Sequence, residues 1–273
     1  MNSKMQSPIR PVVQVIGDVR HPNFRDAIEL LDVDAQIVNA ANQSPELILV
    51  AQSRPGMIAG RIVDALRRTA PLAGIVSLVG SWCEGETRTG KPWPGVERLH
   101  WYEFPTWWRR QLARRVAGRC PDWSRPGDHR FRISQTSEPS EPGGPSLRLG
   151  LIALRTPHRA TAAALSDTLR RAGYATAWQP QGHPTSAVRG ALAGIWDGGQ
   201  LSDHEADDLL AFCKRLANDG APVMAMLDFP RRDCADRATQ IGVAAVLGKP
   251  WLSVDLLAML QKIVEPSKRA RAA

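Results

Sequence analysis

Short apolar runs alternate with amphipathic stretches between Leu147 and Val264, and this rhythm restricts the chain to few folds. Strands are expected at 147–154, 174–178, 193–196, 222–227 and 244–247, and helices at 160–172, 187–192, 204–217, 234–241 and 254–264. Continuous apolar runs of this length are typical of strands buried on both faces. Parallel neighbours need crossover connections, which the helical stretches supply. The pattern predicts an α/β domain with a doubly wound parallel sheet.

The region before it repeats the rhythm. Strands are expected at 11–17, 35–40, 46–51 and 74–80, and helices at 24–31 and 58–68. Two halves of similar order predict two doubly wound domains in tandem, at 9–123 and 147–265. Residues 124–146 between them are rich in Ser, Pro, Gly and Glu, which predicts a flexible linker. Residues 266–273 are basic and polar, and we expect a disordered tail.

Composition narrows the classes of protein further. The chain has no apolar stretch of the roughly 20 residues that a membrane helix needs, and its N-terminus lacks the apolar core of a secretory signal. We therefore expect a cytoplasmic protein without a membrane partner. The cysteines (Cys83, Cys120, Cys213 and Cys234) show no metal-binding spacing, so no metal is expected. The net charge of +8 raises the question of nucleic acid, although no nucleic-acid-binding motif is present.

Three charged residues follow successive strands of the second domain. Asp197 comes after the third strand, Asp228 after the fourth and Lys249 after the fifth. In open parallel sheets the carboxyl ends of the strands form the usual binding edge. Two carboxylates and an ammonium there could bind a cation or a phosphoryl group, with the lysine neutralising charge on phosphoryl oxygens.

The fifth strand carries a recognisable signature. Its end, GKPW (Gly248–Trp251), resembles the Lys-Pro signature of response-regulator receiver (CheY-like) domains, and IGVAAVLGKPW is similar to the family's longer stretch. The resemblance covers 147–264. It implies a flavodoxin-like fold, a cis bond before Pro250 and Asp197 as the phosphoacceptor. It also implies a protein partner in a two-component phosphorelay, a histidine kinase or another regulator.

The departures from the family weaken its chemistry. Active receivers carry an acidic pair after the first strand to hold Mg²⁺, where this chain has Ala153, Leu154 and Arg155. The switch Thr or Ser is replaced by Leu227 or Asp228. Without hard oxygen ligands a Mg²⁺ site loses most of its charge, so no cofactor is expected. We expect a residual ion pair between Asp197 and Lys249, and the conventional phosphoacceptor is the alternative.

The first domain is more degenerate. PELILVAQSRPG (45–56) resembles the receiver stretch that carries the phosphoacceptor, but Ala51 stands at the acceptor position. Alanine cannot accept a phosphoryl group, so this half is expected to be phosphorylation-silent. Asp18 is either a remnant of the acidic pair or an ordinary surface residue.

A segment between Trp82 and Arg119 is rich in tryptophan and arginine, which is the composition of interface hot spots. Its candidate interaction residues are Trp93, Trp101, Trp107, Trp108, Arg109 and Arg110. Trp82, Trp101 and Trp107 could instead cover the sheet, whereas Trp93 and Trp108 are expected at the surface.

These features predict a non-enzymatic pseudo-receiver that acts through protein contacts. One alternative is a nucleic-acid-binding adaptor that stacks bases on the tryptophans. Another is an enzyme built on Cys83 and His100, whose spacing with Glu84 and Glu86 matches no ligand pattern.

Overall fold

The computed structural model describes residues 10–39, 44–86, 90, 92–124 and 150–272, with only the backbone of 266–272. The chain divides into two compact units, Met1–Thr136 and Ser137–Ala273. The division falls within the predicted linker, most of which lies outside the described residues.

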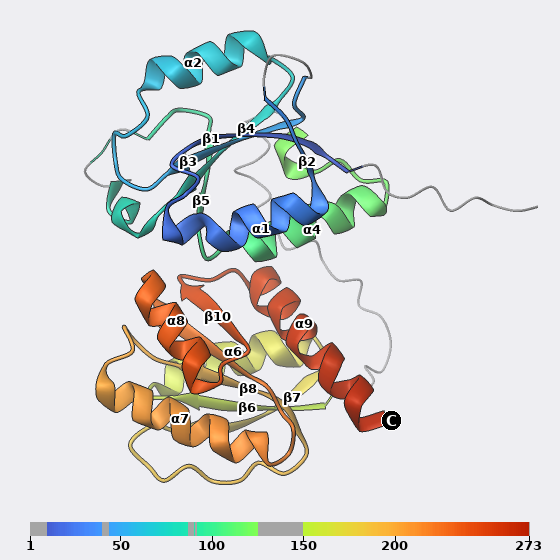
Figure 1. Cartoon of the computed structure of the whole chain (residues 1–273). Helices are drawn as coiled ribbons and strands as arrows, with labels where there is room; N and C mark the ends of the chain where they lie inside the picture. The colour runs from blue at the N-terminus through green and yellow to red at the C-terminus, as the bar shows by residue number, and fades with distance from the viewer. Residues whose placement is uncertain (1–9, 40–43, 87–89, 91, 125–149, 273) are drawn as a thin grey trace, which may run out of the picture. The chain divides into compact units, whose positions relative to one another are not determined.

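Unit 1 is a parallel sheet with helices on both faces (Figure 1). Its strands are β1 (Val12–Gly17), β2 (Gln36–Ile37), β3 (Leu47–Gln52), β4 (Gly74–Val79) and β5 (Glu97–His100). Its α-helices are α1 (Arg25–Asp34), α2 (Gly60–Thr69) and α4 (Phe104–Val116), and its 3-10 turns are η1 (Pro22–Phe24), η2 (Ser81–Cys83) and η3 (Asp122–Ser124). The strand order is β2-β1-β3-β4-β5.

Unit 2 is a second parallel sheet of the same design. Its strands are β6 (Gly150–Thr156), β7 (Tyr174–Pro180), β8 (Ala191–Asp197), β9 (Val223–Asp228) and β10 (Ala245–Lys249). Its helices are α6 (Arg159–Arg171), α7 (Asp203–Ala217), α8 (Arg232–Ile241) and α9 (Ser253–Ala272). The order β10-β9-β8-β6-β7 is 2-1-3-4-5 when the strands are numbered within the unit, as in unit 1. Both units are therefore flavodoxin-like, and the predicted fold class is confirmed.

The core of unit 2 lies on both faces of its sheet. Leu165 and Leu169 of α6 pack with Leu256 and Leu260 of α9 on one face. Leu209 and the rest of the buried side of α7 pack with α8 on the other face. This arrangement explains the continuously apolar strands, because each strand residue meets a helix on one side or the other.

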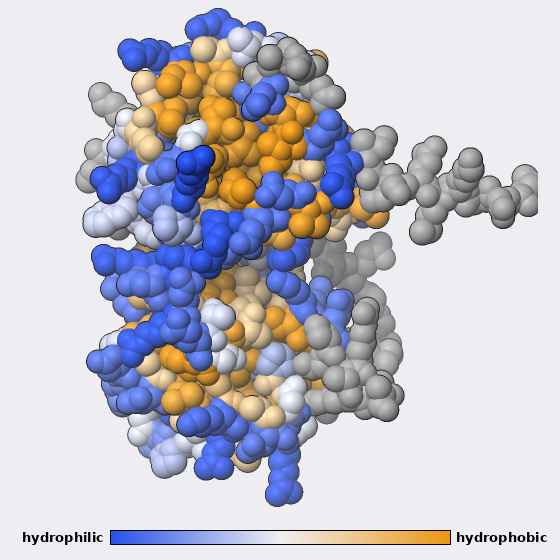
Figure 2. Space-filling view, viewed as in Figure 1, coloured by the Kyte–Doolittle hydropathy of each residue, from blue (hydrophilic) through white to orange (hydrophobic). Residues whose placement is uncertain are grey.

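In unit 1, α1 and α4 lie side by side on one face and α2 covers the other (Figure 1). Figure 2 shows apolar residues gathered on the side of this unit between α2 and α1, over the β2 edge of the sheet. Ile37 of β2 and Ile62 of α2 are exposed. The described residues between β2 and β3, 38–39 and 44–46, contain no helix that would cover this edge.

Two expected features of unit 2 were wrong. Residues 187–190 are not helical, and β8 already begins at Ala191. The backbone N–H of Ser186 donates to the side chain of Gln179, and the backbone C=O of Ser186 accepts from it. Gly190 has a φ of +75°, which is outside the helical region. The residues between these two points are too few to form a helix. The expected disordered tail instead continues α9 as far as Ala272.

In the described part of unit 1, β5 and α4 were not predicted from the sequence. Its β2 is also shorter than expected and includes only Gln36 and Ile37. Among the described residues, no helix is long and apolar enough to cross a membrane.

Candidate functional site

The carboxylate of Asp197 is the centre of the candidate site in unit 2. Asp197 is the last residue of β8, and it is only 3% exposed. Its Oδ2 accepts a hydrogen bond of 2.7 Å from the Thr156 hydroxyl, and its Oδ1 accepts one of 2.8 Å from Lys249 Nζ. Both carboxylate oxygens are thus engaged by neighbouring side chains.

Lys249 joins the ends of three strands. Besides Asp197, its ammonium lies 2.9 Å from Asp228 Oδ1 and donates to the carbonyl of Gly198 at 2.7 Å. Burial alone would lower the pKa of Lys249, but the hydrogen bonds and charges of the two carboxylates outweigh it and raise that pKa. The predicted Asp197–Lys249 ion pair is confirmed, and the Lys249–Pro250 bond is cis as the resemblance implied.

The end of β6, the position at which active receivers carry their acidic pair, has a buried cation in this chain. The Arg155 side chain is 2% exposed and forms an ion pair with Asp208 of α7. Its remaining N–H groups donate to the carbonyls of Pro180 (3.2 Å) and His183 (2.9 Å). Burial would raise the pKa of Asp208, but hydrogen bonds from Arg155 and from Trp196 Nε1 (2.8 Å) lower it overall. This edge therefore has a satisfied guanidinium in place of metal ligands.

A third carboxylate, Glu205, fixes the loop that follows Asp197. It accepts hydrogen bonds from the backbone N–H of Gly199 (2.5 Å) and of Ser202 (2.8 Å). The latter bond belongs to a capping box at the start of α7. Burial opposes the charge of Glu205, yet these bonds lower its pKa. Within the described parts of the chain, no three His, Cys, Asp or Glu side chains are placed to hold a metal ion.

The strand registers give the corresponding positions in unit 1. Gly17 pairs with Ala51, and Ala51 pairs with Leu78, just as Asp197 pairs with Met226. Counting along these registers places Gly17, Ala51, Gly80 and Trp101 where unit 2 has Thr156, Asp197, Asp228 and Lys249. All charged members of the site are therefore replaced together. A side chain at Gly17 would lie 2.1 Å from the Ala51 carbonyl oxygen, so the position leaves no room for a metal-binding carboxylate.

The tryptophan-arginine segment differs from its predicted role. Trp101, Trp107 and Trp108 are buried, and the expectation that Trp108 is exposed was wrong. Trp108 stacks with Phe104 and Trp123, and its indole N–H bonds Asp34 of α1. Trp108 and the rings packed against it are buried, so they are not available to a partner.

The rest of the segment lies closer to the surface. Trp93 is half-buried against the α2 face of the sheet, Arg109 is exposed and Arg110 is half-buried. Trp82, which was considered as a covering residue, is 68% exposed. The exposed aromatic of this segment is thus not one of its predicted interaction residues.

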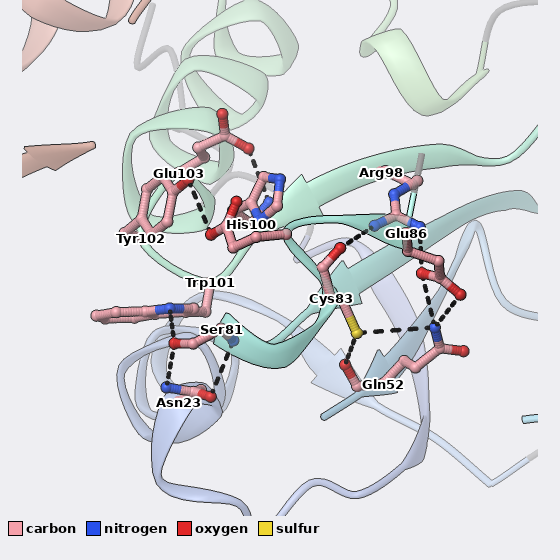
Figure 3. Close-up of polar contacts among 11 residues, drawn as sticks. Asn23, Gln52, Ser81, Cys83, Glu86, Arg98, His100, Trp101, Tyr102 and Glu103 are labelled. Atoms are coloured by element: carbon pink, nitrogen blue, oxygen red, sulfur yellow. Dashed lines mark hydrogen bonds and ion pairs between the residues drawn. The ribbon is translucent and has the colours of Figure 1, made fainter. Parts of the chain in front are cut away.

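The residues around Cys83 and His100 fall into separate groups (Figure 3). Cys83 Sγ contacts the Gln52 side chain, whose amide also donates to Glu86, and Glu86 pairs with Arg98. Burial raises the pKa of the Cys83 thiol, which makes it a poorer nucleophile.

His100 belongs to the other group. Its Nδ1 lies 3.2 Å from Glu84 Oε1, and its ring stacks on Tyr102. The two groups give no thiol–imidazole pair, which disfavours the enzyme hypothesis.

Comparisons with known proteins were made for the sequence and for the structure. No family model matches the chain, and no curated protein matches it. Among solved structures, a response regulator receiver protein from Pseudoalteromonas atlantica is similar at 20% identity and a TM-score of 0.37, over 43% of this chain and 98% of that one. The signal receiver domain of a signal transduction histidine kinase from Syntrophus aciditrophicus has 20% identity and a TM-score of 0.36, over 44% and 93%. Full-length FixJ from B. japonicum has 21% identity and a TM-score of 0.34, over 46% of this chain and 64% of its own.

Several members of the site were missed in the sequence. Thr156 and the Arg155–Asp208 pair are contacts between distant segments, for which no spacing is diagnostic. Glu205 had a signal, because Ser202 followed by a glutamate three residues later is a capping box that ends a loop.

Proposed function

We propose that this chain is a regulatory protein of the two-component type whose receiver-like units work by protein contact and not by phosphoryl transfer. The observation that carries the proposal is the state of Asp197, whose two carboxylate oxygens are bound to Thr156 and Lys249. A carboxylate that attacks a phosphoryl group needs oxygen ligands beside it for the metal ion that neutralises the incoming group, and the groups beside Asp197 are a hydroxyl and an ammonium.

The surroundings of Asp197 support this view. Arg155 brings a positive charge to the end of β6, and its guanidinium is fully occupied by Asp208 and two carbonyls. A divalent cation beside Asp197 would meet the ammonium of Lys249 and would find no carboxylate ligand at the end of β6. In unit 1 the same positions carry no ionisable group at all, so the proposal covers both halves.

The rival function is that of a conventional phosphoacceptor. It is favoured by the retained triangle of Asp197, Asp228 and Lys249, which has the lysine in contact with both carboxylates. The two functions differ in whether a small phosphodonor can modify Asp197.

The test uses acetyl phosphate with Mg²⁺ on the full chain, with intact mass as the readout. We expect no phosphoryl adduct, because the end of β6 offers Arg155 and Thr156 where Mg²⁺ would need carboxylate ligands. A receiver domain with an intact acidic pair, treated in parallel, shows that the reagent is active. An adduct that disappears in Asp197→Asn would establish the phosphoacceptor and overturn the proposal.

A further inference from the structure

Trp82 is an exposed aromatic side chain held on an immobilised turn. It is 68% exposed, whereas both of its neighbours in η2 are held by hydrogen bonds. Ser81 accepts from Trp101 Nε1 at 3.1 Å, and its backbone N–H donates to Asn23 Oδ1 at 3.3 Å. On the other side, the carbonyl of Cys83 accepts from Arg98 at 3.0 Å. Figure 3 shows these contacts below and beside the turn.

Three loops meet around this turn at the carboxyl edge of the sheet. A side chain at Gly80 would lie 2.9 Å from Asn23 Oδ1 and 3.0 Å from the Ser53 carbonyl oxygen, so the loops after β1, β3 and β4 are in contact. The Ser53 hydroxyl also bonds Asp18 at 2.7 Å and approaches Met57 Sδ at 3.4 Å. These loops therefore form one continuous surface within unit 1.

Among the described residues of these loops, the exposed side chains are apolar or basic, and the carboxylates of Asp18 and Glu84 are half-buried. Met57 is exposed beside Ser53, and Arg20 and Arg54 are exposed in the loops after β1 and β3. Within the described residues, neither arginine forms an ion pair, and the carboxylate of Asp18 accepts from Ser53. A tryptophan presented on a rigid turn, with an arginine in each of the two neighbouring loops, has the composition of interface hot spots. Its rigidity reduces the entropy lost on binding.

We propose that these three loops, centred on Trp82, bind a protein partner through an acidic segment that carries an apolar side chain. The apolar side chain packs on Trp82 and Met57, and the acidic residues pair with Arg20 and Arg54. The inference rests on the proposed function, because it assigns the protein contact to a defined surface. The aromatic ring of this proposed surface is Trp82, which is exposed, whereas Trp101, Trp107 and Trp108 are buried.

Selection from a phage-displayed library of random peptides on the full-length protein tests the inference. We expect enriched peptides to combine Asp or Glu with a bulky apolar residue. Trp82→Ala should weaken their binding by about tenfold or more, as loss of a hot-spot aromatic does. Arg54→Glu should weaken it through charge repulsion. Leu72→Ala is the matched control, since Leu72 is 96% exposed in the same unit but precedes β4 at the opposite edge of the sheet.

Three outcomes would overturn the inference. They are the absence of any enriched peptide, enriched peptides without acidic residues, and peptides that bind Trp82→Ala as well as the parent. A single-stranded DNA probe provides a further arm, because DNA binding that needs Trp82 and falls with salt would assign the surface to nucleic acid. The acetyl phosphate assay reports on Asp197 in unit 2, so failure of one experiment is distinguishable from failure of the other.

Discussion

Asp197 is buried, and its neighbours replace the hydrogen bonds to water that its carboxylate loses on burial. Lys249 supplies the counter-charge, and the Thr156 hydroxyl satisfies the second oxygen. Arg155 and Asp208 also compensate each other's charge away from water, and the partners of their hydrogen bonds all lie in unit 2. An intact buried ion pair adds little to the free energy of unfolding, but removal of one partner lowers that free energy by several kcal/mol.

The Arg155–Asp208 pair makes stability depend on pH. Because the pKa of Asp208 is lowered from its ordinary 3.8, its ionised form stabilises the fold above that value. This contribution is lost as the pH falls below 3.8 towards the folded-state pKa. We expect Asp208→Asn to lower the free energy of unfolding of unit 2 by about 2–4 kcal/mol at pH 7, since Arg155 is left without a counter-ion. The difference from the parent should shrink below pH 4 in urea titrations.

The exposed Asp167–Arg170 pair of α6 provides the control. Asp167→Asn should change the free energy of unfolding by less than about 1 kcal/mol. Equal effects of the two substitutions at pH 7, or a difference for Asp208→Asn that does not vary with pH, would contradict the assignment.

At the scale of elements, α4 shows how one helix separates two kinds of residue. Phe104, Trp107, Trp108 and Gln111 follow one another at helical spacing and face inward, where Gln111 bonds Asp122 in both directions. Arg114 and Arg115 continue this face by one turn and pair with Asp122 and Glu46, whereas Arg109 is exposed. The aromatic residues are thus structural, and two of the arginines are held by ion pairs within unit 1.

Trp108→Ala tests the role of α4. Removing a fully buried indole leaves a large cavity and an unpaired Asp34, so we expect a loss of about 3–5 kcal/mol in the free energy of unfolding of unit 1. Trp82→Ala, which removes the same side chain from an exposed turn, should cost less than about 1 kcal/mol. Chemical denaturation followed by far-UV circular dichroism measures both. A larger loss for Trp82→Ala would contradict the burial pattern.

At the scale of the whole molecule, the chain consists of two sheets with the same strand order and separate cores. Unit 2 has Asp197, Asp228 and Lys249 in contact at the carboxyl edge of its sheet, and unit 1 has Ala51, Gly80 and Trp101 at the corresponding positions. The proposed partner surface lies on unit 1. On this view, unit 1 provides contact, and any response to phosphoryl chemistry would have to come from Asp197.

Separate cores predict separate unfolding. Trp108→Ala should move only the transition of unit 1 in scanning calorimetry, and Asp208→Asn only that of unit 2, with additive effects in the double variant. Residues 147–273 expressed alone identify the transition of unit 2. Non-additive shifts, or a change in both transitions from one substitution, would show energetic coupling between the units.

Most of the fold follows from local sequence pattern. The apolar runs of both halves predicted nine of the strands that the structure contains, because most of these strands are buried on both faces and must be apolar along their length. β5 of unit 1 was not predicted, because its sequence, ERLH, carries charged and polar residues at the edge of the sheet and gives no apolar run. The helix that was wrongly predicted at 187–192 has residues with some helix propensity. It does not form, because the side chain of Gln179 binds the backbone of Ser186 directly before it.

The sequence alone determined that two doubly wound domains are present, that Ala51 cannot accept a phosphoryl group, and that Asp197 and Lys249 meet at one edge of a sheet. These conclusions depend on residue identity and on strand order, which local pattern reveals. Only the tertiary structure decided that Thr156 and Arg155 complete the site, that Trp108 is buried and that Trp82 is exposed. Burial and hydrogen-bond partners depend on which distant segments the fold brings together, and no spacing along the chain specifies them.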